Sequence, residues 1–187
     1  NWVAPSPLGN YLVILWNRPG NERCRGVELY NIDSGRYAGH IGESGAHSDL
    51  GLDTAGREIF TSFYQGYIGM TTFPGATSAN SFRADSSESY FKVLLDPGYG
   101  HIWHVSCKGP RGVCVVTSEP GVNGEPFDGE IYLVYTNSEV QLGGNNDGAI
   151  VRRLAHHRSN DDGNSPGCNS ADEIYTYRAQ PQASMAR

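Results

Sequence analysis

The six histidines of this chain are grouped, and they are the residues best suited to chemistry. They occur as three pairs along the sequence: His40 and His47, His101 and His104, and His156 and His157. A neutral imidazole can ligate a divalent metal or accept a proton as a general base. No H-E-x-x-H motif or comparable signature defines a ligand set. Any site therefore depends on the elements that bring these pairs together.

Short β-type runs carry the histidines, separated by turns of Gly, Asp, Asn and Ser with almost no helical periodicity. Three segments align on a turn glycine: Ser6–Trp16 on Gly9, Asp53–Ser62 on Gly56, and Gly109–Ser118 on Gly112. A second alignment supports the first, because Val27–Asp33 begins 18 residues after Gly9 and Glu130–Tyr135 begins 18 residues after Gly112. The chain is therefore an internal repeat of short strands.

A strand, a Gly turn, a second strand, a third at a fixed offset and a fourth form the blade of a β-propeller. The expected fourth strands are Arg36–His40, Tyr90–Leu95 and Ala149–Ala155. The expected innermost strands are Ala46–Asp53, His101–Cys107 and, at the C-terminus, Gln180–Arg187. The N-terminus is expected to enter at its Gly turn without an inner strand.

This pattern predicts one all-β domain, residues 1–187, that is a β-propeller segment of about three four-stranded blades. The approximate blades are 1–43, 44–98 and 99–178, with 179–187 as an inner strand of a further or neighbouring blade. Because propellers typically close with about four to eight blades, we expect either the rest of a longer propeller or a homo-oligomer. A β-sandwich is the alternative, since regularly spaced strands suit both folds.

Inner strands line the channel of a propeller, so histidines from different blades are expected to converge there. The position nine residues before a turn glycine holds His47 in one unit and Trp103, next to His104, in the following unit. Asp49 shares the strand face of His47. We predict four candidate ligands for Mn²⁺, Ca²⁺ or Zn²⁺: His47, Asp49, His104 and Gln180. The alternative is a structural network in which His and Asp tie inner strands to loops.

Aromatic and cationic residues near the expected channel mouth are candidates for ligand binding. Trp103 offers a stacking face for a glycan or peptide, whereas most other aromatics are expected to pack between blades. The run His156-His157-Arg158 forms either a cationic cluster for an acidic sugar or a set of partners for loop backbone groups. The predicted ligand-binding residues are Trp103, His101, His156, His157 and Arg158.

Two of the four cysteines are placed to form a disulfide. Cys107 and Cys114 bracket a turn-rich stretch between two apolar runs, so they face each other across a predicted hairpin. The pairing of Cys24 and Cys168 stays open. No C-x-x-C motif is present, which excludes zinc-ribbon and thioredoxin-like sites. The pair fits an oxidising compartment, hence a secreted or cell-envelope protein, and the alternative is four free thiols in a cytosolic one.

Composition and charge narrow the class of protein. With 38% apolar and 18% charged residues the chain can bury a core, while 24 Gly and 10 Pro disfavour long helices. A net charge of −6 and a pI near 5.4 argue against nucleic-acid partners, which need a positive surface. No run of about 18 apolar residues exists, so no membrane span is predicted.

Several segments resemble the blades of secreted TolB-like β-propellers: Ser6–Val13, Gly45–Gly56, Arg153–Ser159 and Ala179–Ser184. The resemblance covers most of the chain and implies a fold more than an activity. The chain is also similar to the oligogalacturonate lyases, and this second likeness implies a divalent metal held by His and Gln in the propeller channel.

The expected function is an extracellular binding or assembly module without its own catalysis, taking a glycan or a protein ligand. One alternative is a metal-dependent lyase on acidic oligosaccharides, in which the metal acidifies the proton beside a carboxylate and His104 removes it as general base. A second alternative is a ring or filament subunit in which Gln180–Arg187 pairs with the unit at Gly9 of a neighbouring copy.

Overall fold

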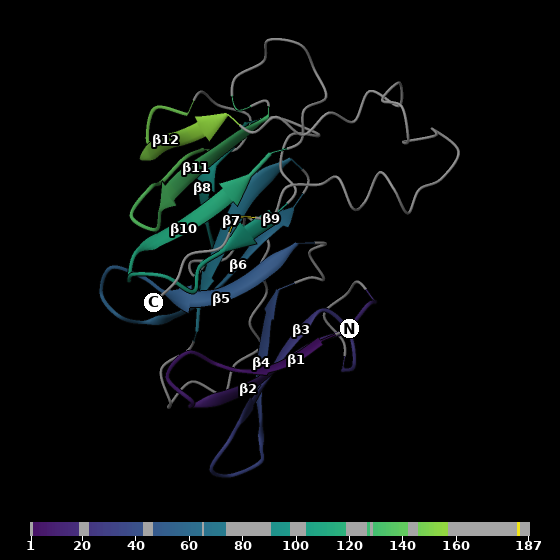
Figure 1. Ribbon diagram of the computed structural model, residues 1–187. Coiled ribbons are helices and arrows are strands. Elements are labelled where there is room, and N and C mark those ends of the chain that lie inside the picture. Colours follow the sequence, from purple (N-terminus) through teal and green to yellow (C-terminus); the bar gives the residue numbers. More distant parts are fainter. Residues whose placement is uncertain are drawn as a thin grey trace, which may run out of the picture.

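The structure is a computed structural model, and it confirms the prediction of an all-β chain with four-stranded units. It describes residues 2–18, 23–42, 47–64, 66–73, 91–97, 104–118, 127, 129–141, 146–156 and 183. In these residues the chain forms twelve strands and no helix, and the strands make three four-stranded antiparallel sheets (Figure 1). No helix among them is long and apolar enough to cross a membrane.

Each sheet is a meander of four consecutive strands. Sheet 1 comprises β1 (Trp2–Pro5), β2 (Tyr11–Leu15), β3 (Val27–Asn31) and β4 (Tyr37–Gly42). Sheet 2 comprises β5 (Ser48–Leu52), β6 (Glu58–Tyr64), β7 (Tyr67–Thr72) and β8 (Phe91–Leu95). Sheet 3 comprises β9 (His104–Ser106), β10 (Val113–Thr117), β11 (Glu130–Tyr135) and β12 (Val151–His156). This strand order is that of a propeller blade.

The turn glycines occupy the same conformation in all three units. Gly9, Gly56 and Gly112 each have a φ of 79°, a left-handed value that residues other than Gly rarely adopt. The N–H of Gly9 donates to Ser6 O, and that of Gly56 to Asp53 O, at 2.9 Å in both turns. The predicted alignment on these glycines is therefore confirmed.

The expectation that the N-terminus lacks an inner strand is wrong. Residues 2–5 form β1, which pairs with β2 from Trp2 opposite Leu15 to Pro5 opposite Leu12. The hairpin is closed by Ser6, whose N–H donates to Tyr11 O at 2.7 Å and whose Oγ accepts the Tyr11 N–H at 3.0 Å. A short run that ends in proline is not typical of a strand. An edge strand such as β1 tolerates Pro because fewer of its backbone N–H groups donate to a neighbouring strand.

Sheet 2 packs between the other two sheets. One apolar cluster joins β2, β3 and β4 to Leu50, Phe60 and Phe73 of the second unit. Another joins Ile59 and Met70 to the buried side chains of sheet 3. The first strands lie in sequence order across the molecule, with β5 between β1 and β9 (Figure 1), and β5 contacts β9. The arrangement is that of successive blade-like sheets, with packed faces as in a sandwich and no closed barrel among the described residues.

Polar contacts fasten the turns of neighbouring sheets to one another. The buried Glu58 carboxylate of sheet 2 accepts the Leu8 N–H at 2.7 Å and the Asn10 Nδ2–H at 3.1 Å, both from the β1–β2 turn. The Gly112 N–H of sheet 3 donates to Leu52 O at 2.8 Å. These bonds fix the β1–β2 turn, the end of β5 and the start of β10.

Removing the hydroxyl of Tyr132 in β11 is expected to raise the free energy of unfolding by about 1 kcal/mol. The ring is fully buried against Phe127, and within the described part of the chain its hydroxyl has no hydrogen-bond partner. Burial, with Glu130 nearby, raises the pKa of Tyr132, so the group stays neutral. Urea unfolding of Tyr132→Phe measures the gain.

Tyr30→Phe is the matched control, because the Tyr30 hydroxyl donates to Glu28 Oε2 at 3.0 Å. This control should lose stability. Equal losses in the two variants would show that the Tyr132 hydroxyl has a hydrogen-bond partner after all.

Candidate binding groove along the first strands

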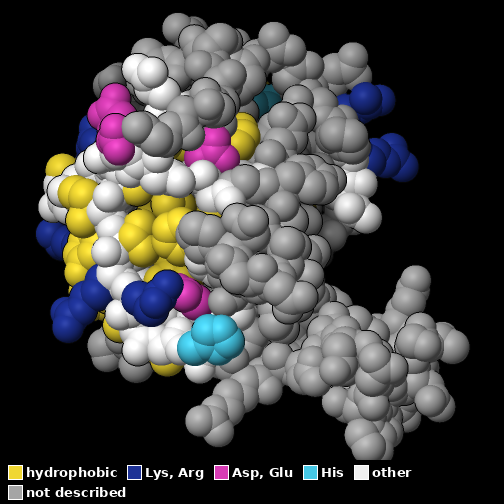
Figure 2. All heavy atoms as spheres, turned by 90° about the horizontal axis from the view of Figure 1, so that it is seen from above, with side chains coloured by type: hydrophobic (Ala, Val, Ile, Leu, Met, Phe, Trp, Pro, Cys, Tyr) yellow, Lys and Arg dark blue, Asp and Glu magenta, His cyan; other side chains and the backbone are white. Residues whose placement is uncertain are grey.

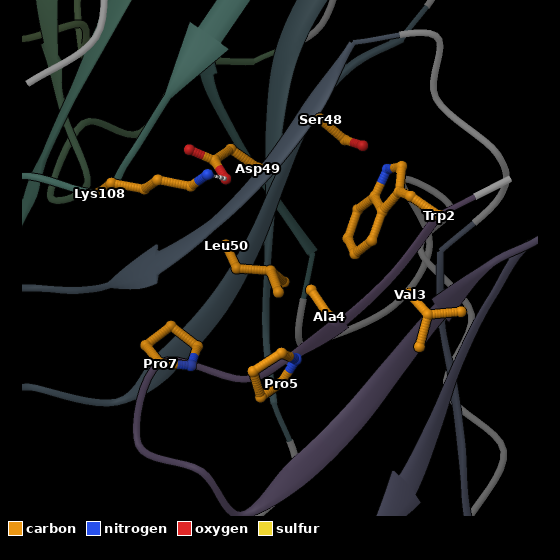
Figure 3. Close-up of a pocket in the computed structure, with 9 residues that line it drawn as sticks. All are labelled: Trp2, Val3, Ala4, Pro5, Pro7, Ser48, Asp49, Leu50 and Lys108. Carbon is orange, nitrogen blue, oxygen red and sulfur yellow. Dashed lines mark ion pairs between the residues drawn. The ribbon is translucent and has the colours of Figure 1, made fainter.

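A groove runs along the first strands of sheets 1 and 2 to the turn that follows β9 in sheet 3. It consists of two adjoining pockets of about 370 and 360 Å³ that share Pro7, Leu50 and Lys108. The first is lined by β1, the start of β5 and Lys108 (Figure 3). The second continues along β5 to the β9–β10 turn at Pro110 and Arg111. We call the two together the inner-strand groove.

The lining of the groove is mostly apolar. In the close-up, β1 supplies Trp2, Ala4 and Pro5, and β5 supplies Leu50 from the facing sheet (Figure 3). Trp2 and Ala4 are half-buried because they also pack on the apolar cluster between sheets 1 and 2. In the space-filling view, a hydrophobic area of the described surface is bordered by basic and acidic side chains (Figure 2).

Asp49 links the groove to the end of β9. Its Oδ2 accepts the Cys107 N–H at 2.9 Å, and its Oδ1 lies 3.9 Å from Lys108 Nζ. The side chain of Asp49 is 14% exposed and that of Lys108 is 69% exposed. Such a solvent-screened pair contributes at most about 1 kcal/mol. The carboxylate therefore serves mainly to fix the backbone, while the ammonium group faces the solvent at the groove.

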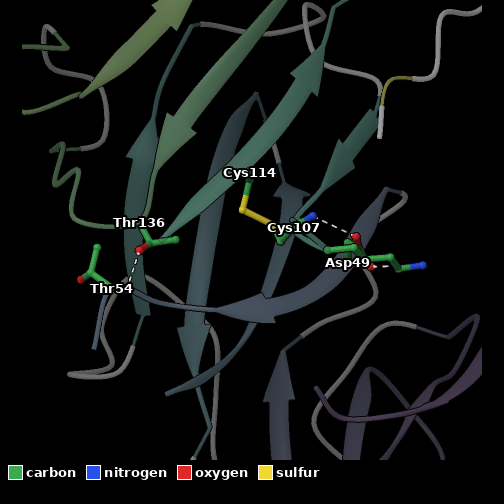
Figure 4. The surroundings of a disulfide bond; sticks show 6 residues. Asp49, Thr54, Cys107, Cys114 and Thr136 are labelled. Carbon is green, nitrogen blue, oxygen red and sulfur yellow. Dashed lines mark hydrogen bonds and ion pairs between the residues drawn. A yellow bond between two sulfur atoms is a disulfide. The ribbon is translucent and has the colours of Figure 1, made fainter. Parts of the chain in front are cut away.

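The predicted disulfide is present at the base of the β9–β10 turn (Figure 4). The bond between Cys107 and Cys114 has an S–S distance of 2.02 Å, and both residues are buried. A side chain at Gly51 would place its Cβ 2.6 Å from Cys107 Cβ, so only glycine lets β5 approach β9 this closely. The disulfide and this contact fix the turn that carries Lys108. A buried disulfide fits an oxidising compartment.

The structure brings together two of the four predicted metal ligands. The rings of His47 and His104 lie edge to face with their centroids 4.7 Å apart. Burial, together with the neighbouring His104, lowers the pKa of His47, so this imidazole is neutral at pH 7 and its lone pair can bind a metal. Gln180 lies outside the described residues. Among the described ones, no group of three or more His, Cys, Asp or Glu is placed to hold a metal.

The other predicted site residues fall in different places. Trp103, His101, His157 and Arg158 lie outside the described residues, as does Cys168. His156 is exposed at the end of β12, away from the residues that line the groove. Cys24 is a free, exposed cysteine.

His40 is a structural residue of sheet 1. It is buried, its Nε2 lies 3.1 Å from Arg25 O, and its Nδ1 lies 2.5 Å from the Tyr37 hydroxyl. A carbonyl only accepts, so Nε2 donates there and Nδ1 accepts from Tyr37. His40 thus ties β4, the fourth strand of its sheet, to the Arg25 backbone, whereas the predicted structural network concerned inner strands.

The sequence interpretation missed Trp2, Lys108 and Arg111 as groove residues. Trp2 precedes Gly9 by seven residues, as Asp49 precedes Gly56, so counting back from every turn glycine would have found it. Lys108 and Arg111 looked like ordinary solvated residues of a turn. Their role depends on the packing of β9 beside β5, which no local pattern encodes.

No protein-family profile, curated protein or solved structure matches this chain.

Proposed function

We propose that this chain is an extracellular, propeller-type binding module whose ligand occupies the inner-strand groove. The observation that carries the proposal is the convergence of all three sheets on one groove, which β1, β5 and the β9–β10 turn line in succession. Propellers commonly place ligands where their first strands meet. The disulfide supports an extracellular or periplasmic location, where it would persist.

The groove offers recognition groups on a rigid frame. Its apolar wall gives contact area, Lys108 gives a positive charge where the two pockets meet, and Arg111 gives another in the second pocket. The frame is rigid because the disulfide, the Asp49 bond to Cys107 and the Gly112 bond to Leu52 hold the strand ends. A preorganised site loses less entropy when a ligand binds.

The test is a variant that fills the groove without altering the fold. Pro7 lines both pockets and lies in the β1–β2 turn, where most residue types are tolerated. Pro7→Trp should reduce the affinity for ligands found on glycan and peptide arrays at least about tenfold. Leu8→Trp is the matched control, since Leu8 is the next residue, is 53% exposed and does not line the groove. Equal binding by both variants would place the ligand site elsewhere.

A second candidate function rests on the contact between His47 and His104. In this proposal the chain is a metal-dependent lyase on acidic oligosaccharides, with both imidazoles as ligands. A divalent ion bound there would acidify the proton beside a substrate carboxylate. The fit is partial, because the Asp49 carboxylate bonds to the Cys107 N–H.

Zinc titration by calorimetry separates this candidate from the first. His104→Ala should weaken Zn²⁺ binding at least about tenfold, whereas His156→Ala, an exposed histidine in the same sheet, should not. Affinity should rise with pH through the histidine pKa, because protons compete for the same nitrogens. Unchanged binding by His104→Ala, or no ultraviolet-absorbing unsaturated product from polygalacturonate with Zn²⁺ or Mn²⁺, would rule out the lyase.

A further inference from the structure

We infer that the ligand of the inner-strand groove is an extended peptide segment that carries acidic side chains among apolar ones. This inference rests on the proposed binding function and names its ligand class. Three properties of the groove support it: its cations, the chemistry of its walls, and its course along the strands.

The groove carries two cations, Lys108 where its pockets meet and Arg111 in the second pocket, in a chain of net charge −6. Lys108 and Arg111 both belong to the short turn between β9 and β10, and both are exposed. Asp49 is the one acidic side chain among the described lining residues, and it accepts the Cys107 N–H. The other Asp49 oxygen lies 3.9 Å from Lys108 Nζ, so these three side chains together carry one net positive charge. An acidic group on the ligand would meet this net positive charge. Charge complementarity of this kind selects an anionic partner.

Arg111 is held near the groove by the packing of neighbouring turns. A Cβ at Gly56 would lie 3.0 Å from Arg111 Nη1, so the guanidinium lies against the turn of sheet 2. A Cβ at Gly112 would likewise lie 2.5 Å from Thr54 Cγ2. The Thr54 N–H also donates to Thr136 Oγ1 at 3.3 Å (Figure 4). The two turns are thus in close contact, which limits the positions that Arg111 can take.

The walls favour a peptide over a sugar. A saccharide presents many hydroxyls and needs several side-chain donors and acceptors. The described lining consists instead of Trp, Val, Ala, Leu, Gly and Pro residues, the disulfide-bonded Cys107 and few polar groups. Ser48 offers little, because its hydroxyl oxygen is shielded from solvent. Extended, proline-containing peptides dock against aromatic side chains, and Trp2 offers one such face in the first pocket.

The course of the groove matches an extended chain. It runs from Trp2 on β1 past Pro7, Leu50 and Lys108, which both pockets share, to Pro110 and Arg111 in the second pocket. A peptide along it would place apolar residues against Trp2 and Leu50 and an acidic residue at Lys108 and Arg111. The predicted motif is therefore Asp or Glu next to apolar residues or proline, with the chain running in either direction.

The test uses a phage-displayed random peptide library selected on the intact chain. Wild type should enrich peptides with Asp or Glu beside Pro, Leu or an aromatic residue. Lys108→Gln combined with Arg111→Gln should lose this acidic preference, and fluorescence anisotropy should show at least about a tenfold loss in affinity for an enriched peptide. The affinity of wild type should also fall as salt concentration rises.

Lys92 supplies the matched control. It is the other lysine of the chain, it lies on β8, and it does not line the groove. Lys92→Gln removes the same charge as Lys108→Gln. Because Lys92 does not line the groove, its replacement should leave peptide affinity unchanged. A charge reversal, Lys108→Glu with Arg111→Glu, should bind a Lys-substituted version of the peptide better than wild type does.

The outcomes separate this inference from the proposed function. If glycans bind the wild type and Pro7→Trp weakens that binding, while no peptide is enriched, the groove is a binding site and the peptide inference is wrong. If versions of the enriched peptides with Asn or Gln in place of Asp or Glu bind the chain equally well, the inference of an acidic ligand is wrong. If no array ligand and no peptide distinguishes Pro7→Trp from Leu8→Trp, both proposals fail.

Discussion

Replacing Glu28 with alanine is expected to lower the free energy of unfolding by about 2 to 4 kcal/mol. This carboxylate on β3 is fully buried and accepts four hydrogen bonds of 2.8 to 3.0 Å. The donors are Trp16 Nε1, Arg23 Nε, the Cys24 N–H and the Tyr30 hydroxyl. Alanine would leave these donors without their acceptor. Urea unfolding at pH 7 measures the loss.

The same carboxylate should make sheet 1 sensitive to acid. Burial raises the pKa of Glu28, but the hydrogen bonds from Cys24, Trp16, Tyr30 and Arg23 outweigh it, and the net pKa lies below its usual value. A group with a lowered folded pKa binds its proton more weakly in the folded state than in the unfolded state. Its stabilisation is therefore complete above the unfolded pKa of about 4.5 and is lost as pH falls through the folded value.

Two variants separate the charge from the side chain. Glu28→Gln keeps the shape, and its deficit relative to wild type should shrink as the pH falls from about 5 to about 3. Glu139→Ala removes an exposed glutamate and should change stability by less than about 0.5 kcal/mol. A pH-independent deficit in Glu28→Gln would show that the charge of Glu28 does not contribute, and the acid prediction would then be wrong.

The burial of Glu28 could not be predicted from the sequence. It stands in Val27–Asn31, next to apolar residues, where strand alternation makes a solvent-facing glutamate the natural expectation. Its burial depends on the preceding loop, which brings the Trp16 indole and the Arg23 guanidinium over the strand. Arg23 also stacks on Tyr37, 4.3 Å from the ring centroid. A loop conformation of this kind has no periodic signature.

The repeat was predictable because it depends on local backbone geometry. A glycine with positive φ is required wherever two strands are joined this tightly, so Gly9, Gly56 and Gly112 recur at matching positions. The same reasoning places His47 and His104 near the start of successive first strands, but the contact of their rings depends on the packing of β5 beside β9. The turns and the strand period can be predicted from the sequence, whereas this contact between sheets cannot.

The groove was harder to predict from the sequence, because it depends on the packing between sheets. The register of β5 against β9 decides that Gly51 meets Cys107 and that Asp49 reaches its N–H. Neither contact can be deduced from hydrophobic alternation within a single strand. The disulfide was predicted from the hairpin alone, yet its effect on the groove depends on this contact between sheets.

Removing the disulfide is expected to lower the free energy of unfolding by about 2 to 4 kcal/mol. Cys107 and Cys114 are seven residues apart, and closing so short a loop restricts the unfolded chain by about 2.5 kcal/mol. The double variant Cys107→Ala with Cys114→Ala also leaves a small cavity in the core that sheets 2 and 3 share. Urea unfolding of the variant, and of wild type with and without reductant, measures the effect.

The loss should reach the groove as well as the global stability, because the disulfide holds the turn that carries Lys108 and Arg111. Amide exchange of Gly112, whose N–H donates to Leu52 O at 2.8 Å, should quicken more than global unfolding explains. Cys24→Ala, which removes an exposed free cysteine, should leave both measurements unchanged. If the double variant kept wild-type stability and the same Gly112 exchange, the turn would be fixed by inter-sheet packing at Gly51 and Asp49 alone. The rigidity of the groove would then be independent of the redox state of its compartment.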